Sequence, residues 1–143
     1  MTGVPPKQQS ADLAWLLGGL AREVSAVRGS VLLSSDGMVK AAHGLDRTES
    51  EYLAALASGL LSMARSASTR FDNGTGVRQV MAELHSSQLF ISWAGHNSVL
   101  AVLAEGGADP AVVGFEMARL IQSVRPFLST AARPGIASPD VRM

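Results

Sequence analysis

The segment VLLSSDGMVKAA, residues 31–42, predicts a β-hairpin and decides how the rest of the chain is organised. Two apolar runs flank the pair Asp36-Gly37, which is typical of a type I′ turn because both central residues of that turn need a positive φ. We therefore expect a strand over residues 31–33, a tight turn at Ser35-Asp36-Gly37 and a second strand over residues 38–42.

Helical patterns lie on both sides of this hairpin. Before it, helical spacing predicts a first helix with Ser10 or Asp12 as its N-cap; its apolar residues are Leu13, Leu16, Leu17, Leu20, Val24 and Val27. After it, capping-box spacing at Asp46 or Thr48 predicts a second helix over residues 52–67.

The second half of the chain predicts three more strands and a last helix. The strands are expected over residues 77–85, 89–94 and 99–104, separated by short polar turns. Asp109 precedes a proline, as at the start of a helix, and Pro126 should kink or end that helix. Short connections indicate an antiparallel sheet, so the order helix, two strands, helix, three strands, helix predicts an α+β fold.

Length and composition favour one soluble domain with a tail at each end. The chain has 143 residues, 47% of them hydrophobic, which is enough for one core. Segments 1–9 and 131–143 contain prolines and no apolar periodicity, so we expect disordered tails around a domain at 10–130. The longest uncharged stretch, residues 84–104, contains two polar turns and predicts strands, not a membrane span. No secretory signal is recognisable, and a cytoplasmic location is expected.

Charge and residue types exclude several classes of function. Twelve basic residues balance twelve acidic ones, so no excess positive charge favours nucleic acid. The chain has no cysteine, which excludes disulfides, thiolate metal sites and cysteine nucleophiles.

Motifs for catalysis or cofactors are also absent from the sequence. Gly74-Thr75-Gly76 follows a helix, the reverse of the order found in phosphate-binding loops. The histidines lack metal-ligand spacing; they are His43, His85 and His96. Ser34, Ser35 and Asp36 suit a hairpin tip better than a nucleophilic site. We therefore predict no catalytic, cofactor-binding or metal-binding residues.

Two stripes on the second helix are the most informative feature. One stripe consists of Leu53, Leu56, Leu60, Met63 and Ala67. The other lies about 100° around the helix and is mostly small; it consists of Ala54, Ala57, Ser58, Leu61 and Ser68. We interpret the leucine stripe as facing the chain's own sheet and the small stripe as allowing a second copy of the helix to approach. The alternative, a helix packed onto its own sheet through the small residues, stays open.

Three segments together resemble the roadblock/dynein light chain family, in particular the bacterial branch found in actinobacterial conservon operons. They are SVLLSSDGMV (30–39), GLDR (44–47) and AALASGLL (54–61), and the similarity extends over about residues 13–128. The resemblance implies a five-stranded antiparallel sheet with one helix on one face and two on the other.

The resemblance also implies a homodimer. In this family the second helices pack together and the third strands pair across a two-fold axis. Carried onto this chain, the implied dimer-interface residues are Ala54, Ala57, Ser58, Leu61, Arg65, Val77, Gln79 and Met81.

The function implied by the resemblance is regulation or scaffolding of a small Ras-like GTPase without catalytic residues or a cofactor. Conservon operons also encode a sensor kinase-like membrane protein, so a signalling complex peripheral to the membrane is expected, with no nucleic acid and no direct membrane insertion. A small-molecule-sensing α+β module is the alternative, because a five-stranded sheet flanked by helices also describes such domains.

Overall fold

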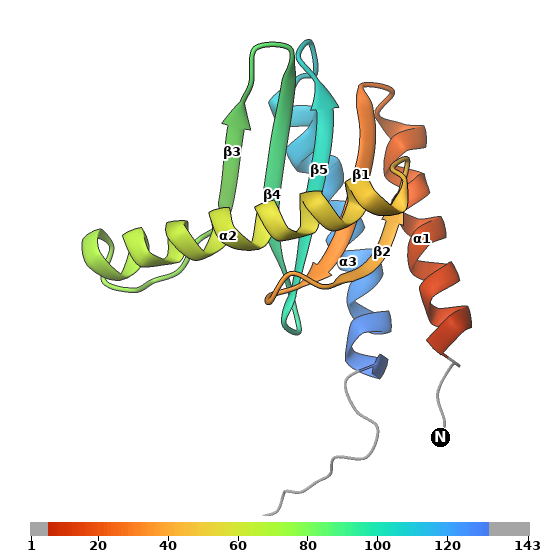
Figure 1. The fold of residues 1–143 in the computed structure, drawn as a ribbon, viewed down its shortest axis with the longest axis horizontal. Helices are drawn as coiled ribbons and strands as arrows, with labels where there is room; N and C mark the ends of the chain where they lie inside the picture. The colour runs from red at the N-terminus through yellow and green to blue at the C-terminus, as the bar shows by residue number, and fades with distance from the viewer. Residues whose placement is uncertain (1–5, 132–143) are drawn as a thin grey trace, which may run out of the picture.

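The computed structural model describes residues 6–131 as a five-stranded antiparallel sheet with helices on both faces (Figure 1). The strands are β1 (Val27–Ser34), β2 (Val39–His43), β3 (Gln79–Glu83), β4 (Ser87–Gly95) and β5 (Ser98–Glu105). They lie in the order β2-β1-β5-β4-β3, so β2 and β3 form the two edges.

One helix covers one face of the sheet and two cover the other (Figure 1). The helices are α1 (Pro6–Glu23), α2 (Arg47–Phe71) and α3 (Pro110–Ala131). Helix α2 crosses the strands on one face, while α1 and α3 lie side by side on the opposite face. The predicted α+β class, element order and arrangement of the layers are confirmed. No helix among residues 6–131 is long and apolar enough to cross a membrane.

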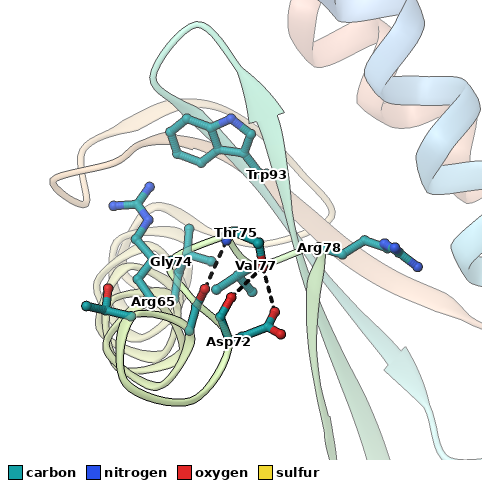
Figure 2. A pocket seen from close by; sticks show the side chains of 11 residues that line it. Arg65, Asp72, Gly74, Thr75, Val77, Arg78 and Trp93 are labelled. Atoms are coloured by element: carbon teal, nitrogen blue, oxygen red, sulfur yellow. Dashed lines mark hydrogen bonds between the residues drawn. The ribbon is translucent and has the colours of Figure 1, made fainter.

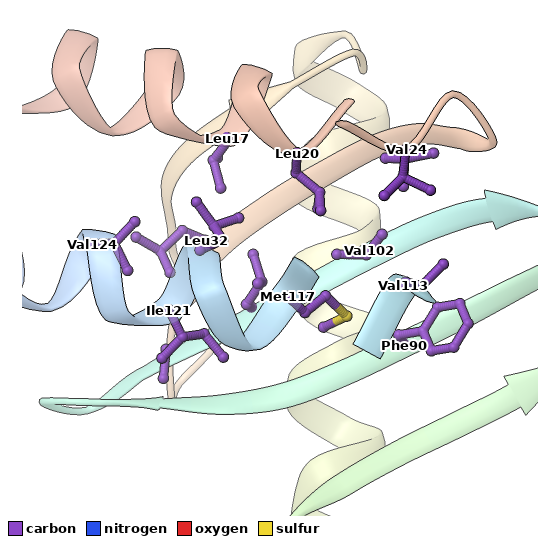
Figure 3. Packing of buried hydrophobic residues seen from close by; sticks show 14 of the residues in the cluster. Leu17, Leu20, Val24, Leu32, Phe90, Val102, Val113, Met117, Ile121 and Val124 are labelled. Carbon is purple, nitrogen blue, oxygen red and sulfur yellow. The ribbon is translucent and has the colours of Figure 1, made fainter. Parts of the chain in front are cut away.

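Each face of the sheet has its own hydrophobic core. Between the sheet and α1 and α3, Leu17, Phe90 and Met117 are almost completely buried (Figure 3). Between the sheet and α2 lies a second cluster, to which the helix contributes Ala54 and Ala57 as well as Leu53 and Leu61.

The helix ends differ from the predicted ones in physically clear ways. Asp46, and not Thr48, is the N-cap of α2, because its Oδ1 accepts a hydrogen bond of 2.8 Å from the Glu49 N–H. Helix α1 begins at Pro6, inside the predicted tail. Helix α3 continues past Pro126, so of the two expectations for this proline, that it kinks or ends the helix, the second is wrong. Proline removes one hydrogen bond, but Val124 and Leu128 on either side of it are buried and hold the helix in place.

The tight turn predicted at Asp36-Gly37 has a different geometry. Gly37 has a φ of +95°, but Asp36 has no positive φ, so the turn is not type I′. A three-residue loop joins Ser34 to Met38 instead, with Gly37 in the left-handed position. The type I′ signature, two consecutive positive φ values, lies between β4 and β5 at His96 (φ 50°) and Asn97 (φ 60°). The remaining residues of the predicted tails, 1–5 and 132–143, lie outside the described residues.

Candidate interaction surface

The small residues of α2 face the chain's own sheet. Ala54 and Ala57 are fully buried and Leu61 is 3% exposed. They pack against large strand residues that include Leu33 and Ile91. The alanines let the α2 backbone lie close to these bulky strand side chains. The small stripe therefore faces the sheet and not away from it, and the assignment of Ala54, Ala57 and Leu61 to a dimer interface stays a prediction.

The polar members of the small stripe also serve the chain itself. Ser58 donates a 2.8 Å hydrogen bond to the carbonyl of Ser35 in the β1–β2 loop and is half-buried, so its assignment to a contact with a second copy stays a prediction. Ser68 is buried, and its hydroxyl accepts a 2.9 Å hydrogen bond from the Gly76 N–H. These bonds join the middle of α2 to the β1–β2 loop and its C-terminal part to the loop before β3.

The outer side of α2 carries large apolar side chains that the sequence interpretation placed inside or did not consider. Leu56 is 40% exposed and Met63 is 64% exposed, whereas Leu53 from the same predicted stripe is buried. Tyr52, near the start of the helix, is 70% exposed. Helical periodicity could not distinguish the two sides, because both are apolar.

The C-terminal half of α2 extends beyond the sheet. Five of the six buried residues of α2 lie between Ser50 and Leu61, and after Leu61 only Ser68 is buried. Figure 1 shows the last turns of α2 passing beyond β3, the edge strand. We call residues 62–71 the overhang. Phe71 at its end is 82% exposed.

Strand β3 borders the overhang and has a free outer edge. It pairs with β4 on one side only. Gln79 and Met81 are exposed, Val77 is half-buried just before the strand, and Leu84 is exposed just after it. Of the implied interface residues, Val77, Gln79 and Met81 are therefore accessible at one continuous edge. The strand is shorter than the predicted 77–85.

A cleft of about 860 Å³ lies beneath the overhang, between α2 and the start of β3 (Figure 2). Arg65 stacks on Trp93, with its guanidinium carbon 4.8 Å from the ring centroid. The loop below is held by Thr75, whose hydroxyl lies 2.6 Å from the Asp72 carboxylate. Arg78 points away from Arg65 and Trp93 in Figure 2. Arg65, another implied interface residue, is exposed on the overhang and lies beside the free edge.

No group of three or more potential metal ligands occurs among the residues that the structure describes. What the region offers chemically is a free strand edge, a protruding helix and exposed apolar side chains. Such features bind other polypeptides through backbone pairing and burial of apolar area.

Comparison with known proteins places this geometry in a family. The family model for the Roadblock/LC7 domain matches residues 13–104. The chain belongs to the Roadblock/LC7 family. A Roadblock/LC7 domain from Streptomyces avermitilis is 54% identical, with a TM-score of 0.80 over 82% of this chain and 98% of that one.

Two further solved structures show how widely this fold is shared. A second Roadblock/LC7 domain from the same species is 35% identical, with a TM-score of 0.64 over 78% of this chain and 96% of that one. The gliding protein MglB from Thermus thermophilus is 16% identical, with a TM-score of 0.75 over 92% of this chain and 96% of that one, a likeness of fold alone. A search of curated proteins found no match. The predicted resemblance to the roadblock family is confirmed.

Proposed function

We propose that this Roadblock/LC7 protein is a non-enzymatic homodimer that regulates or scaffolds a small Ras-like GTPase within a sensor kinase-linked signalling complex. The observation that carries the proposal is the free edge of β3 beside the overhang of α2. A second copy that pairs its own β3 with this edge would cover Met81 and lie beneath the overhang.

Edge pairing accounts for features that are unfavourable in a monomer. An unpaired strand edge with exposed apolar residues is an aggregation hazard unless a partner covers it. With a two-fold axis beside β3, the unpaired backbone groups of both β3 strands would hydrogen-bond to each other in one symmetric contact. It would also bring the overhang of each copy over the sheet of the other.

The proposed action on the GTPase is indirect. An arginine finger must reach the transferring phosphoryl group from an accessible loop. Arg65 is stacked on Trp93 within the cleft, and the tight turns at residues 35–37, 86–87 and 96–97 contain no arginine. We therefore favour a dimer that binds the GTP-bound form more tightly and holds the catalytic residues of the GTPase in place.

The decisive experiment measures GTP turnover by a small Ras-like GTPase from the same operon, with and without this protein. A change in turnover or nucleotide exchange supports regulation, whereas binding without either supports scaffolding. Absence of any complex would contradict the proposal. Alanine variants at Arg65, Arg70 and Arg78 test the mechanism, because loss of a true finger lowers turnover about a thousandfold or more. Such a loss with unchanged GTPase binding and dimer mass would exclude the indirect mechanism.

The cleft beneath the overhang supports the alternative of a small-molecule sensor, because its volume suits a ligand and it combines Arg65 and Trp93 in one wall. The two functions predict different responses to dimerisation. If the second copy covers the cleft, Trp93 fluorescence changes as the protein is diluted through its dissociation constant. A sensor changes that fluorescence only when its ligand is added.

A further inference from the structure

The second face of the sheet is open beside β3, although α1 and α3 cover the rest of it. Phe90 on β4 is completely buried, whereas Met81, paired with it on β3, is 48% exposed. Between α3 and these strands lies a groove with a volume of about 480 Å³. We call it the α3 groove; its walls carry Arg78 and Gln79 on one side and Gly114, Ala118, Gln122 and Arg125 on the other.

The floor and one wall of the α3 groove suit close contact with apolar groups. Met117 and Ile121 form part of its lining and belong to the buried core behind it. Gly114 and Ala118 are one helical turn apart, and a Cβ added to Gly114 would meet no atom within 4 Å. A second helix can therefore approach α3 closely here.

All charged side chains that line the α3 groove are arginines. Within residues 9–128 the ion pairs are Arg47–Glu51 and Arg119–Glu116, so Arg78 and Arg125 both lack an acidic partner there. The Nε atom of Arg125 lies 3.5 Å from the position that a Cβ of Gly95 would take, at the β4–β5 turn. Arg78 lines both the cleft beneath the overhang and the α3 groove, and its side chain points away from Arg65 and Trp93 (Figure 2). An apolar groove thus carries uncompensated positive charge on both of its walls.

We propose that the α3 groove binds an acidic amphipathic helix of a partner protein. Leucine-like side chains of that helix would lie on Met117 and Ile121, and its carboxylates would form charge-assisted hydrogen bonds with Arg78 and Arg125. The charge pattern selects this occupant, since a basic or neutral helix would leave both guanidinium groups unpaired beside it. The proposal does not depend on the GTPase. Pairing at the β3 edge uses backbone groups in the plane of the sheet; Gln79 would border both contacts, whereas Arg78 and the α3 residues of the groove are not among the implied dimer-interface residues.

The test uses two synthetic amphipathic helical peptides of about four turns, identical except that one carries Glu and the other Lys on its polar face. The full-length protein is titrated with each peptide while amide NMR signals and peptide anisotropy are recorded. We expect the acidic peptide to bind at least about tenfold more tightly, less so as salt is added, with shifts centred on Gly114, Ala118 and Gln122. Equal affinity for both peptides, or shifts confined to other surfaces, would overturn the proposal.

Charge reversal supplies the matched control. Arg78→Glu and Arg125→Glu should each weaken the acidic peptide about tenfold or more and favour the basic one, whereas Arg47→Glu, far from the groove, should change neither. Loss of the dimer in both groove variants would assign these arginines to contact with a second copy and overturn the proposal. Tighter binding of dodecyl phosphate than of the acidic peptide would assign the groove to a small amphiphile and overturn it equally.

Discussion

The two edges of the sheet are built in opposite ways. At the β2 edge, the strand register shifts between Leu32 and Leu33, which leaves Lys40 as an extra residue on β2. Helix α1 packs along this strand so closely that a Cβ on Gly18 would lie 3.2 Å from the His43 ring. At the β3 edge the pairing with β4 is regular, and Met81 is half-exposed.

This difference indicates which edge of the sheet is available for association with a second chain. A bulge, an inward-reaching charge and a covering helix are three ways in which proteins prevent pairing at an edge. Lys40 supplies the charge, since its ammonium donates a hydrogen bond to the buried hydroxyl of Ser98. The β2 edge has all three protections and β3 has none of them, so a second copy has one edge at which to pair.

The largest expected effect is on the free energy of unfolding and concerns the part of α2 that packs on the sheet. Ala57→Asp should destabilise the fold by about 3–5 kcal/mol, because the carboxylate would be buried without a partner. Ala55→Asp introduces the same charge at an exposed position of the same helix and should cost little. Urea denaturation of both variants checks the comparison. Equal stability would mean that the small residues of α2 do not face the sheet.

At the open edge, Met81→Glu should dissociate the proposed dimer without unfolding the monomer. Like charges would face each other across the proposed two-fold axis, and we expect the dissociation constant to rise about a hundredfold, or about 2.7 kcal/mol. Sedimentation velocity over a concentration series measures the change. Met81→Leu is the matched control and should remain dimeric. A wild-type protein that is monomeric at micromolar concentration would contradict the proposed assembly.

A pair of glycines compares the space at the two edges. Gly44 follows β2 with a φ of +82°, and a Cβ there would lie 2.5 Å from the Arg28 carbonyl oxygen. Gly76 precedes β3 with a φ of +108°, and a Cβ there would meet nothing within 4 Å. Both alanine variants incur backbone strain of about 1 kcal/mol, but Gly44→Ala should lose roughly 1–2 kcal/mol more because of the steric overlap. Thermal unfolding of both variants measures the difference. Equal losses of stability would show that the backbone at the β2 edge makes room for a Cβ as readily as the backbone at the β3 edge.

The smallest expected effect concerns Lys40 and depends on pH. Burial lowers the pKa of its ammonium group from the ordinary value of 10.5, and the Asp36 carboxylate opposes that shift. Between the folded pKa and 10.5 the unfolded chain binds more protons, so the wild type gains stability relative to Lys40→Met as the pH rises through this interval. Denaturation at about pH 7 and near pH 10 measures the change.

Asp36→Asn provides the control for the Lys40 prediction. Without the Asp36 carboxylate, the pKa of Lys40 in the folded protein should fall further. The pH range over which the wild type gains stability should then begin at a lower pH. A constant difference between wild type and Lys40→Met across the whole range would show that the buried ammonium does not titrate differently on folding.

Much of the fold could be predicted because local patterns suffice for it. Asp46 and Asp109 cap helices where the sequence placed caps, and Ile91 and Val102 lie in strands that the apolar runs predicted. Such signals depend on neighbours within a few residues, so a single sequence contains them in full. The resemblance to the family then supplied the arrangement of the layers.

The orientation of α2 could not be predicted in the same way. Leu56 and Ala57 are adjacent and both apolar, so periodicity allowed either to face the sheet. The choice depends on strand residues such as Leu33 and Ile91, which are distant in sequence and form one cluster with Ala57. The type I′ turn was misplaced for a related reason, because His96-Asn97 is a weaker turn signal than Asp36-Gly37 and takes its geometry from the pairing of β4 with β5.

The length of α2 links stability to the amount of protein present. Twenty-five residues give a helix of about 37 Å, whereas five strands span only about 19 Å from the first to the last. In an isolated chain the overhang is held by the Arg65–Trp93 contact and the hydrogen bond between Ser68 and Gly76, and helical turns with so little tertiary support are marginal in water. If the second copy supplies that support, part of the folding free energy becomes bimolecular and the melting temperature rises with protein concentration. A cell could then set the lifetime of the folded protein through its level of expression.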